Sequence, residues 1–417
     1  MSSFSIPLSG LSASADALNV ISNDLANLNT VGFKDQEASF EDLFYQNIGT
    51  SGSGNPIQEG MGTHIGSIST NYSDGAVQAT GVPSNVAITG NGFFISQDAT
   101  GVLHYTRSGG FSENTQGDLI TSSGDTVLGY PAVNGVVNTG GALGALQVGS
   151  NLVSPPSATT TMQQQTNLDA TAAVGTTYSA PLTAYDSLGA SHILTFNFTE
   201  TAPNTWGYQI TMPAADTGGT GNPTVVASGS LSFDSNGNLA SPTGSVTGIS
   251  VAGLADGAAT MNLTWNLANS SGGSLITQVA SPSTTSTTTQ NGYANGTLRS
   301  YMVDADGTIE GTFTNGQTQA LGQIVLASFS NVQGLQAVGG DDYVPTLASG
   351  AAVAGVPNAG GRGTLTGGAL EMSNVDISTE FTRLIVTQRG FEANARMITT
   401  LDSINNTTTN LQAQPGN

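Results

Sequence analysis

The chain has 417 residues, and 28 acidic side chains against 7 basic ones give it a formal net charge of −21. This negative charge repels the phosphate backbone of DNA and RNA, which argues against sequence-independent nucleic-acid binding. The absence of cysteine excludes disulfide scaffolds, iron–sulfur clusters and cysteine nucleophiles. Hydrophobic residues make up 37% of the chain and charged residues only 8%, a composition typical of a folded, mainly β protein with few ion pairs.

The N-terminal segment has the periodicity of a helix. From Ser5 to about Thr30 the apolar residues follow one another at steps of three and four, and Leu11, Leu18 and Leu25 are spaced seven apart. A seven-residue repeat on a narrow stripe is typical of a coiled coil. The start of the chain lacks the basic and apolar regions of a cleaved secretory signal, and no stretch is apolar enough to span a bilayer. We therefore expect neither a cleaved signal nor membrane insertion.

The middle of the chain has β patterning. Residues 93–96 and 103–106 read as strands around a turn at 97–101. A turn motif, with Asn or Asp followed by Gly three positions later and an aliphatic residue after that, occurs at 114–119, 234–239 and 304–309. This motif predicts bulged hairpin turns. The acidic residues at 304–310 also suggest a calcium loop, but their spacing does not fit the ligand positions of an EF-hand.

Residues 148–288 form a segment with its own composition. The segment contains no lysine or arginine, holds both Trp206 and Trp265, and is flanked by Ser/Thr/Pro-rich joints. We expect an inserted β domain that leaves and re-enters its host at neighbouring points.

A second heptad pattern lies near the C-terminus. Ile377, Leu384, Phe391 and Ile398 are spaced seven apart. Asp376, directly before them, is a residue type that caps the N-terminus of a helix. The two terminal stripes can cover each other within one chain as an ordinary helical hairpin, or pack between chains. Their narrowness favours packing between subunits.

The sequence offers no constellation for catalysis, for a cofactor or for a metal. His64, His104 and His192 are far apart, so we expect each to be a surface or strand residue rather than a ligand. No nucleophile elbow or phosphate loop occurs, and the paired acidic residues carry no mark of a general acid and base. We predict that the protein is not an enzyme.

Motifs at both ends carry a specific resemblance. The run from Asn23 through Asn27 to Gly32-Phe33-Lys34 closely resembles the N-terminal signature of the bacterial flagellar rod and hook family. The C-terminal partner signature matches at Asn374, Asp376 and Gln388-Arg389-Gly390. In the middle, Gly90-Asn-Gly92 and Thr314-Asn-Gly-Gln-Thr318 also match, and the size of the insertion resembles the hook members rather than the shorter distal rod members. Leu28 and Asn29 depart from the small residues usual in the family.

The resemblance implies a mainly β fold with α-helical termini. Its parts would be a terminal helical coiled-coil domain (1–30 and 372–417), a connecting segment (31–72), a discontinuous β domain (73–147 and 289–371) and an inserted outer β-barrel-like domain (148–288). The inner-layer packing residues would be Leu11, Leu18, Leu25, Ile377, Leu384, Phe391 and Ile398.

The function implied by the resemblance is structural. The chain would polymerise into a curved, flexible tube that transmits torque from rod to filament and conducts exported subunits. Implied partners are further copies of itself, the distal rod protein, the hook-capping protein, the hook–filament junction protein and the flagellar type III export apparatus. The implied location is extracellular, at the flagellar hook and basal body. A distal rod-type subunit and, from another class, a secreted β-rich adhesin are the alternatives, although an adhesin does not explain heptads at both termini.

Overall fold

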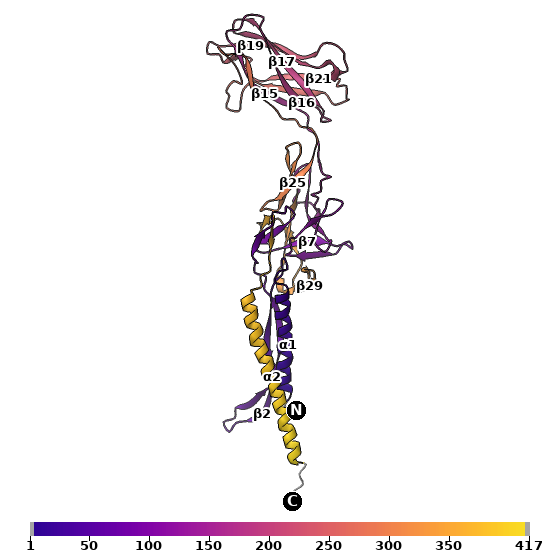
Figure 1. The fold of residues 1–417 in the computed structure, drawn as a ribbon, viewed down its shortest axis with the longest axis vertical. Helices are drawn as coiled ribbons and strands as arrows, with labels where there is room; N and C mark the ends of the chain where they lie inside the picture. Colours follow the sequence, from indigo (N-terminus) through magenta and orange to yellow (C-terminus); the bar gives the residue numbers. More distant parts are fainter. Residues whose placement is uncertain (1–3, 413–417) are drawn as a thin grey trace. The chain divides into compact units, whose positions relative to one another are not determined.

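The computed structural model describes residues 4–412 and shows a mainly β protein with one helix near each end (Figure 1). Two compact units divide the chain. Unit 1 comprises 1–149, 300–311 and 318–417, and unit 2 comprises 150–299 and 312–317. Strands β25 (Gly296–Val303) and β26 (Thr308–Phe313) run across the boundary.

The terminal helices are α1 (Ser5–Ala26) and α2 (Ile377–Gln412), so both predicted helices are confirmed. They lie side by side and antiparallel in unit 1, one indigo and one yellow in Figure 1. At the end of α1, the Asn27 Nδ2 donates to the Asn23 carbonyl at 2.9 Å. At the start of α2, Asp376 Oδ1 accepts from the Thr379 amide at 2.7 Å, as its capping chemistry predicts.

Segments from opposite ends of the sequence pair in unit 1. Strand β5 (Val77–Ala79) pairs with β33 (Ala369–Glu371), and β6 (Val86–Thr89) pairs with β32 (Thr364–Gly367). Two hairpins follow α1, in which β1 (Gln36–Asp42) pairs with β4 (Thr63–Thr70) and β2 (Tyr45–Thr50) pairs with β3 (Pro56–Gly60). The strand pairs β5–β33 and β6–β32 bring the chain leaving α1 close to the chain entering α2.

The main sheet of unit 1 has the order β27-β11-β7-β8-β30-β29, and its predicted hairpin β7–β8 is confirmed. Buried aliphatic and aromatic side chains such as Val127 and Phe94 form its core. The remaining elements of this unit are β7 (Phe93–Gln97), β8 (Leu103–Thr106), β9 (Ser112–Glu113), β10 (Leu119–Ile120), β11 (Thr126–Val133), β12 (Val136–Val137), β13 (Gly144–Ala145), β27 (Thr318–Ile324), β28 (Leu326–Ser328), η2 (Val332–Gly334), β29 (Gln336–Gly339), β30 (Asp342–Val344) and β31 (Val353–Gly355).

Unit 2 is a sandwich of two five-stranded sheets. One has the order β21-β22-β15-β23, with β24 also paired to β15, and the other has the order β16-β17-β18-β19-β20. Their elements are β15 (Thr161–Asp169), β16 (Thr177–Tyr185), β17 (Ser191–Ala202), β18 (Thr205–Met212), η1 (Ala214–Thr217), β19 (Thr224–Phe233), β20 (Leu239–Ser241), β21 (Val246–Val251), β22 (Met261–Asn266), β23 (Ile276–Val279) and β24 (Thr284–Gln290), besides the short β14 (Val153–Ser154).

The expected barrel-like form of the insertion is wrong, because unit 2, whose residues all lie in the described range, contains no closed barrel. Side chains from both sheets, including Trp206 and Trp265, join one buried core. Each sheet covers the apolar face of the other. Both faces are therefore shielded from water, although neither sheet closes into a barrel.

The three predicted hairpin turns are confirmed. Gly117, Gly237 and Gly307 have φ of 87°, 78° and 85°, the left-handed region that glycine adopts without strain. In the first turn, Asn114 Oδ1 accepts from the amides of Gln116 and Asp118 at 2.9 and 2.8 Å. These contacts satisfy backbone amides within the turn.

Candidate assembly site

The buried face of α1 lies one residue before the predicted leucine row. Its buried residues are Pro7, Gly10, Ala13, Ser14, Ala17, Ile21 and Asp24, whereas Leu11, Leu18 and Leu25 are half-buried along its edge. Gly10, Ala17 and Asp24 each directly precede one of these leucines, so both rows share the seven-residue spacing. The small residues form the contact face because they let another helix approach closely, and their own spacing was the signal that a search for apolar residues overlooked.

Helix α2 is the partner at this face. A Cβ added to Gly10 would lie 2.7 Å from Asn394 Nδ2, and one added to Gly390 would lie 3.8 Å from Ser14 Oγ. At the first distance any side chain on residue 10 would displace the Asn394 amide group, so Gly10 leaves room for Asn394 at the contact between the helices.

Three of the four predicted residues of α2, Leu384, Phe391 and Ile398, are half-buried, and Ile377 is 45% exposed. Other large apolar side chains of α2 are exposed, namely Phe381, Ile385, Val386, Met397 and Ile404. Helix α2 therefore carries more apolar surface than α1 covers.

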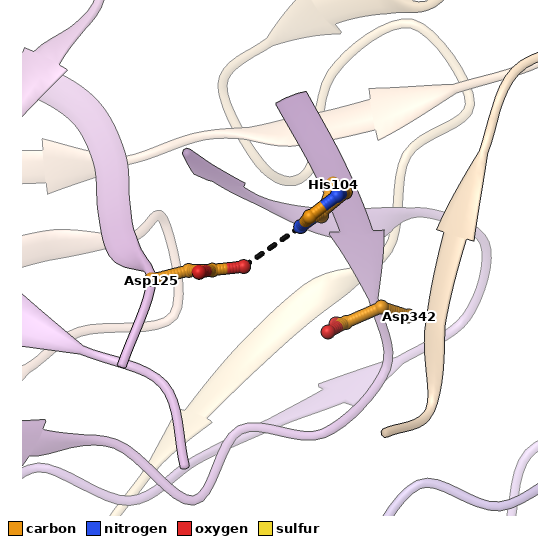
Figure 2. A group of neighbouring side chains, drawn as sticks. All are labelled: His104, Asp125 and Asp342. Atoms are coloured by element: carbon orange, nitrogen blue, oxygen red, sulfur yellow. Dashed lines mark hydrogen bonds and ion pairs between the residues drawn. The ribbon is translucent and has the colours of Figure 1, made fainter. Parts of the chain in front are cut away.

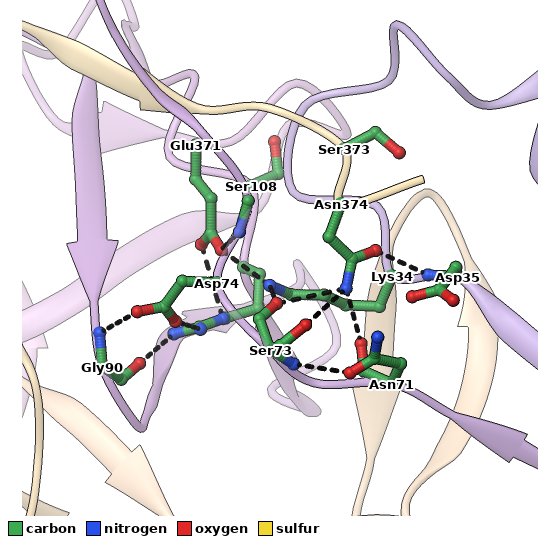
Figure 3. A network of polar contacts seen from close by, with 12 residues as sticks. Lys34, Asp35, Asn71, Ser73, Asp74, Gly90, Ser108, Glu371, Ser373 and Asn374 are labelled. Atoms are coloured by element: carbon green, nitrogen blue, oxygen red, sulfur yellow. Dashed lines mark hydrogen bonds and ion pairs between the residues drawn. The ribbon is translucent and has the colours of Figure 1, made fainter. Parts of the chain in front are cut away.

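The signature residues around the end of α1 lie next to a polar cluster, the junction cluster, made of the buried Lys34, Arg107 and Glu371 together with Asp74 and Asn374 nearer the surface. Figure 3 shows Lys34, Asp74, Glu371 and Asn374 of this cluster. Lys34 Nζ donates to Glu371 Oε1 and to the Ser73 carbonyl, both at 2.6 Å, and both charged side chains are fully buried. Burial and the nearby Arg107 lower the pKa of Lys34, while Glu371 opposes this shift.

Arg107 directly follows β8 of the main sheet and joins the same cluster. Its guanidinium contacts Asp74 at 2.9 Å and Glu371 at 3.5 Å, and donates to the carbonyls of Gly90 and Gly92. The junction cluster thus ties four separate stretches of chain together by charge-assisted contacts.

Asn374 and Gly32 complete the junction. The Asn374 side chain accepts from the Asp35 amide at 2.8 Å and donates to the Asn71 carbonyl at 2.8 Å (Figure 3). Gly32, with φ of 77°, donates its amide to the Glu371 carbonyl, and a Cβ there would lie 2.6 Å from the Ser108 nitrogen. Both positions therefore have a structural reason for their residue type.

The other predicted signature residues have local roles. Phe33 accepts from the Asn374 amide through its carbonyl. Gln388 Nε2 lies 3.4 Å from Glu392 Oε1 one helical turn later, and Arg389 is exposed. Asn23 and Asn27 end α1, and Asp376 begins α2.

A group of carboxylates is buried where α1, α2 and β1 meet. Burial raises the pKa of Asp24 to about 6, with Glu380 and Asp35 adding to the effect and the Gln36 amide opposing it. Burial also raises the pKa of Asp35 and of Glu380, although Arg383 opposes it in both. Three oxygens, Asp24 Oδ1, Asp35 Oδ1 and Glu380 Oε2, are buried without a hydrogen-bond partner among the described residues.

Residues of metal-ligating type meet on the main sheet at His104, Asp125 and Asp342 (Figure 2). His104 Nδ1 lies 2.7 Å from Asp125 Oδ2, so this ring nitrogen is engaged in an ion pair. That pairing raises the pKa of His104, and burial raises the pKa of Asp342. We interpret the group as an ion pair with a buried neighbouring carboxyl.

No helix within residues 4–412 combines the length and apolarity needed to cross a membrane.

Four family descriptions match along the chain. They are "Flagella basal body rod protein" at residues 6–34, "Flagellar hook protein FlgE/F/G D1 domain" at 87–164, "Flagellar basal body protein FlaE D2 domain" at 151–293 and "Flagellar basal body rod FlgEFG protein C-terminal" at 366–411.

Full-length similarity connects the chain to named proteins. It is 37% identical to the flagellar hook protein FlgE of Salmonella typhimurium, over 98% of this chain and 100% of that protein. It is 35% identical to the FlgE of Escherichia coli over 98% and 100%, and 33% identical to that of Treponema pallidum over 97% and 98%. The crystal structure of Helicobacter pylori flagellar hook protein FlgE2 aligns with 71% of this chain and 100% of its own, at 15% identity and a TM-score of 0.49.

Proposed function

Because the chain belongs to the flagellar hook protein FlgE family and is a structural subunit that polymerises in the hook, we propose that its terminal helices form the layer through which copies pack. The observation that carries this proposal is the apolar surface that α1 and α2 leave uncovered after packing on each other.

The half-buried row Leu11, Leu18 and Leu25 borders the α1–α2 contact, and the exposed residues Phe381 and Val386 lie on α2. Apolar side chains repeating every seven residues can insert between those of a neighbouring helix. Burying them contributes about 25 cal/mol per Å² of apolar surface removed from water. We infer that the helices first pair within a subunit through small residues and then pack between subunits as a coiled-coil layer through these larger ones.

The hairpins after α1 support the same proposal. Large apolar side chains are exposed along them, with Phe44 70% and Ile48 59% exposed, and the others being Phe40, Tyr45, Ile57 and Ile68. Several exposed apolar side chains on the same two hairpins are typical of a surface that makes protein–protein contacts. The connecting segment 31–72 would therefore add to the subunit contacts.

The remaining parts of the proposal follow the family. Residues 1–30 and 372–417 would form the inner layer, of which residues 1–3 and 413–417 lie outside the described range. Residues 73–147 and 289–371 would form the middle domain and 148–288 the outer one. Partners would be the distal rod protein, the hook-capping protein, the hook–filament junction protein and the type III export apparatus, through which the chain would reach the cell exterior without a cleaved signal.

Electron microscopy of the purified protein tests the packing role. The native chain should form tubes, whereas deletion of residues 1–25 should abolish polymerisation and leave the fluorescence of Trp206 and Trp265 native. Leu11→Ala/Leu18→Ala/Leu25→Ala should raise the protein concentration required for polymerisation at least tenfold, because three apolar contacts per subunit are lost.

The matched control is Ser12→Ala/Asn19→Ala/Ser22→Ala, three exposed positions on the same helix, which should polymerise as the native chain does. Tubes formed by the deletion variant, or equal effects of the two triple variants, would overturn the proposed role of the leucine row.

A further inference from the structure

His192 is the single basic side chain between residues 148 and 288. It lies on β17, paired with Ala184 of β16, and is 6% exposed. A buried imidazole in so acidic a segment calls for a chemical explanation, because burial of a charge is costly unless it is paired.

Three carboxylates surround the His192 ring, and we name these four residues the His192 cluster. Nε2 lies 2.9 Å from Asp186 Oδ2 and 3.9 Å from Asp256 Oδ2, and Nδ1 lies 3.1 Å from Asp216 Oδ2. Asp186 follows β16, Asp216 belongs to η1, and Asp256 lies between β21 and β22. Among the described residues, no other carboxylate forms an ion pair with this ring.

The geometry determines where the proton lies. A neutral imidazole donates from one nitrogen only, yet both nitrogens of His192 face carboxylate oxygens at hydrogen-bond distance. Asp186 Oδ1 already accepts from the amides of Leu188 and Ala190, which leaves Oδ2 as an acceptor for the ring. The arrangement therefore favours an imidazolium with two charge-assisted hydrogen bonds over a neutral ring facing a protonated carboxyl.

The pKa shifts at the site also favour a protonated His192 ring and an ionised Asp186. Burial by itself lowers the pKa of His192, but the hydrogen bonds to Asp186 and Asp216 outweigh it, so the net shift is upward from 6.5. Burial raises the pKa of Asp186, but contacts with Asp256, His192 and two backbone amides lower it to about 2.

We propose that protonated His192 is a pH-sensitive clasp that joins the 186–190 turn, η1 and the 252–258 connection, and that loss of its proton releases η1. Other contacts between these segments are the Asp186–Asp256 side-chain contact and two neutral hydrogen bonds, from Ala255 N to the Asp216 carbonyl at 2.9 Å and from Ala259 N to Ser187 Oγ at 2.9 Å. The side chains of Asp216 and Asp256 are 27% and 33% exposed, so water can reach the ring past both. Asp256 keeps its contact with Asp186 when the ring loses its proton, whereas Asp216 loses its charge-assisted partner, so η1 is the segment we expect to be released.

The sign of the pH dependence follows from the two shifts. The His192 contribution to stability is complete below 6.5 and is lost as the pH rises through the higher pKa of the folded state. The Asp186 contribution is complete above 3.8 and is lost as the pH falls toward about 2. The clasp therefore holds across the mildly acidic range and opens on the alkaline side.

The test uses the full-length chain with isotope-labelled histidine. The ring signals of His64, His104 and His192, assigned with single His→Gln variants, are followed by NMR from about pH 5 to about pH 10. Hydrogen exchange of peptides covering η1 and 252–258 is measured over the same range and corrected for intrinsic rates. We expect His192 to titrate above 6.5, and exchange at η1 to rise at least fivefold with the same midpoint.

Asp216→Asn should lower the pKa of His192 by about one unit, because it removes one opposite charge at a partly exposed position. The matched control is Asp234→Asn, which alters an exposed turn carboxylate of the same unit that accepts from the amides of Asn236 and Asn238. It should leave the pKa of His192 unchanged.

Three results would each overturn the proposal. One is His192 titrating below 6.5, which would place the proton on the Asp186–Asp256 pair instead. Another is exchange at η1 whose pH dependence persists in His192→Gln. The third is a ring signal that responds to EDTA or to added Zn²⁺, which would make a metal ion rather than a proton the occupant of the cluster.

Discussion

At the scale of single residues, the junction cluster shows how charged side chains connect two segments that are far apart in the sequence, the one after α1 and the one before α2. Lys34 and Glu371 are 337 positions apart and fully buried, with 2.6 Å between Nζ and Oε1. Removing one partner of such a pair leaves a buried charge without its nearest counter-charge, which costs more than the pair itself contributes, although Glu371 keeps the Arg107 guanidinium at 3.5 Å. The cluster therefore makes the exit from α1 and the entry to α2 mutually dependent.

We predict that Lys34→Met and Glu371→Gln each lower the free energy of unfolding of unit 1 by about 3 kcal/mol. The double variant should be less destabilised than the sum of the two, because neither charge is then left alone. Urea denaturation of all three variants measures this coupling. Arg362→Met is the control, since the Arg362 guanidinium donates to the Val356 carbonyl at 3.0 Å. Strictly additive losses would contradict a direct Lys34–Glu371 coupling.

A second residue-scale prediction concerns Asp24, whose pKa is raised from 3.8 to about 6. The unfolded chain releases this proton at lower pH than the folded chain does, so unit 1 should lose stability as the pH rises from 3.8 to about 6. Asp24→Asn should remove most of this loss and stabilise unit 1 near neutral pH by about 2 kcal/mol.

Urea unfolding followed by the helical circular dichroism signal, across this pH range, measures the Asp24 effect. Asp16→Asn, on the exposed side of the same helix, is the control and should keep the native pH dependence. An Asp24→Asn variant with the same pH dependence as the native chain would show that the Asp24 carboxyl is not the titrating group.

At the scale of elements, α1 presents two different faces. Small residues face α2, and the larger leucines border that contact, so close pairing within a subunit leaves apolar side chains for contacts between subunits. Dispersion contacts act only over short distances. The face of α1 toward α2 therefore depends on the absence of a side chain at Gly10, and the leucine row depends on its large side chains.

Gly10→Leu should strain the contact between α1 and α2, because its Cβ would lie 2.7 Å from Asn394 Nδ2 and the rest of the leucine side chain would have to take the place of the Asn394 amide group. We expect a loss of about 1–3 kcal/mol in the stability of unit 1 and impaired polymerisation. Gly49→Leu is the control, because a Cβ at Gly49 would meet no atom within 4 Å. Unfolding curves and electron microscopy measure the stability and the polymerisation of both variants. Equal stability and equal polymerisation of the two would refute a close contact between the helices at Gly10.

At the scale of the whole molecule, charge is unevenly distributed along the chain. Three of the 7 lysine and arginine residues, Arg383, Arg389 and Arg396, lie on α2, whereas 148–288 contains no lysine or arginine. With a net charge of −21, each subunit added to a polymer meets repulsion from those already present.

Added salt should therefore favour polymerisation. The Debye length falls from about 30 Å at 0.01 M to about 8 Å at 0.15 M, so repulsion between neighbouring subunits is largely screened at the higher concentration. We expect the pelleted fraction of the native chain to rise with NaCl at constant protein concentration, with sucrose of equal osmolality as the control. A pelleted fraction that falls with salt would show that attractive ion pairs dominate the contacts.

The sequence by itself determined the features that depend on neighbours along the chain. The two terminal helices and the cap at Asp376 follow from spacing and local hydrogen bonding, and the three glycine turns follow from the conformational freedom of glycine. The family also followed from contiguous motifs, because such motifs can be read without a three-dimensional partner.

Only the tertiary structure decided the features that depend on contacts between distant segments. A heptad pattern locates a stripe to within about one residue, since adjacent positions differ by about 100° around the helix, so it did not distinguish the Gly10–Ala17–Asp24 face from the leucine row. No local pattern pairs Lys34 with Glu371 or gathers three carboxylates around His192. Alternation along a strand identifies its buried face but not whether the sheet closes, and in unit 2 the opposing sheet, rather than closure, covers that face.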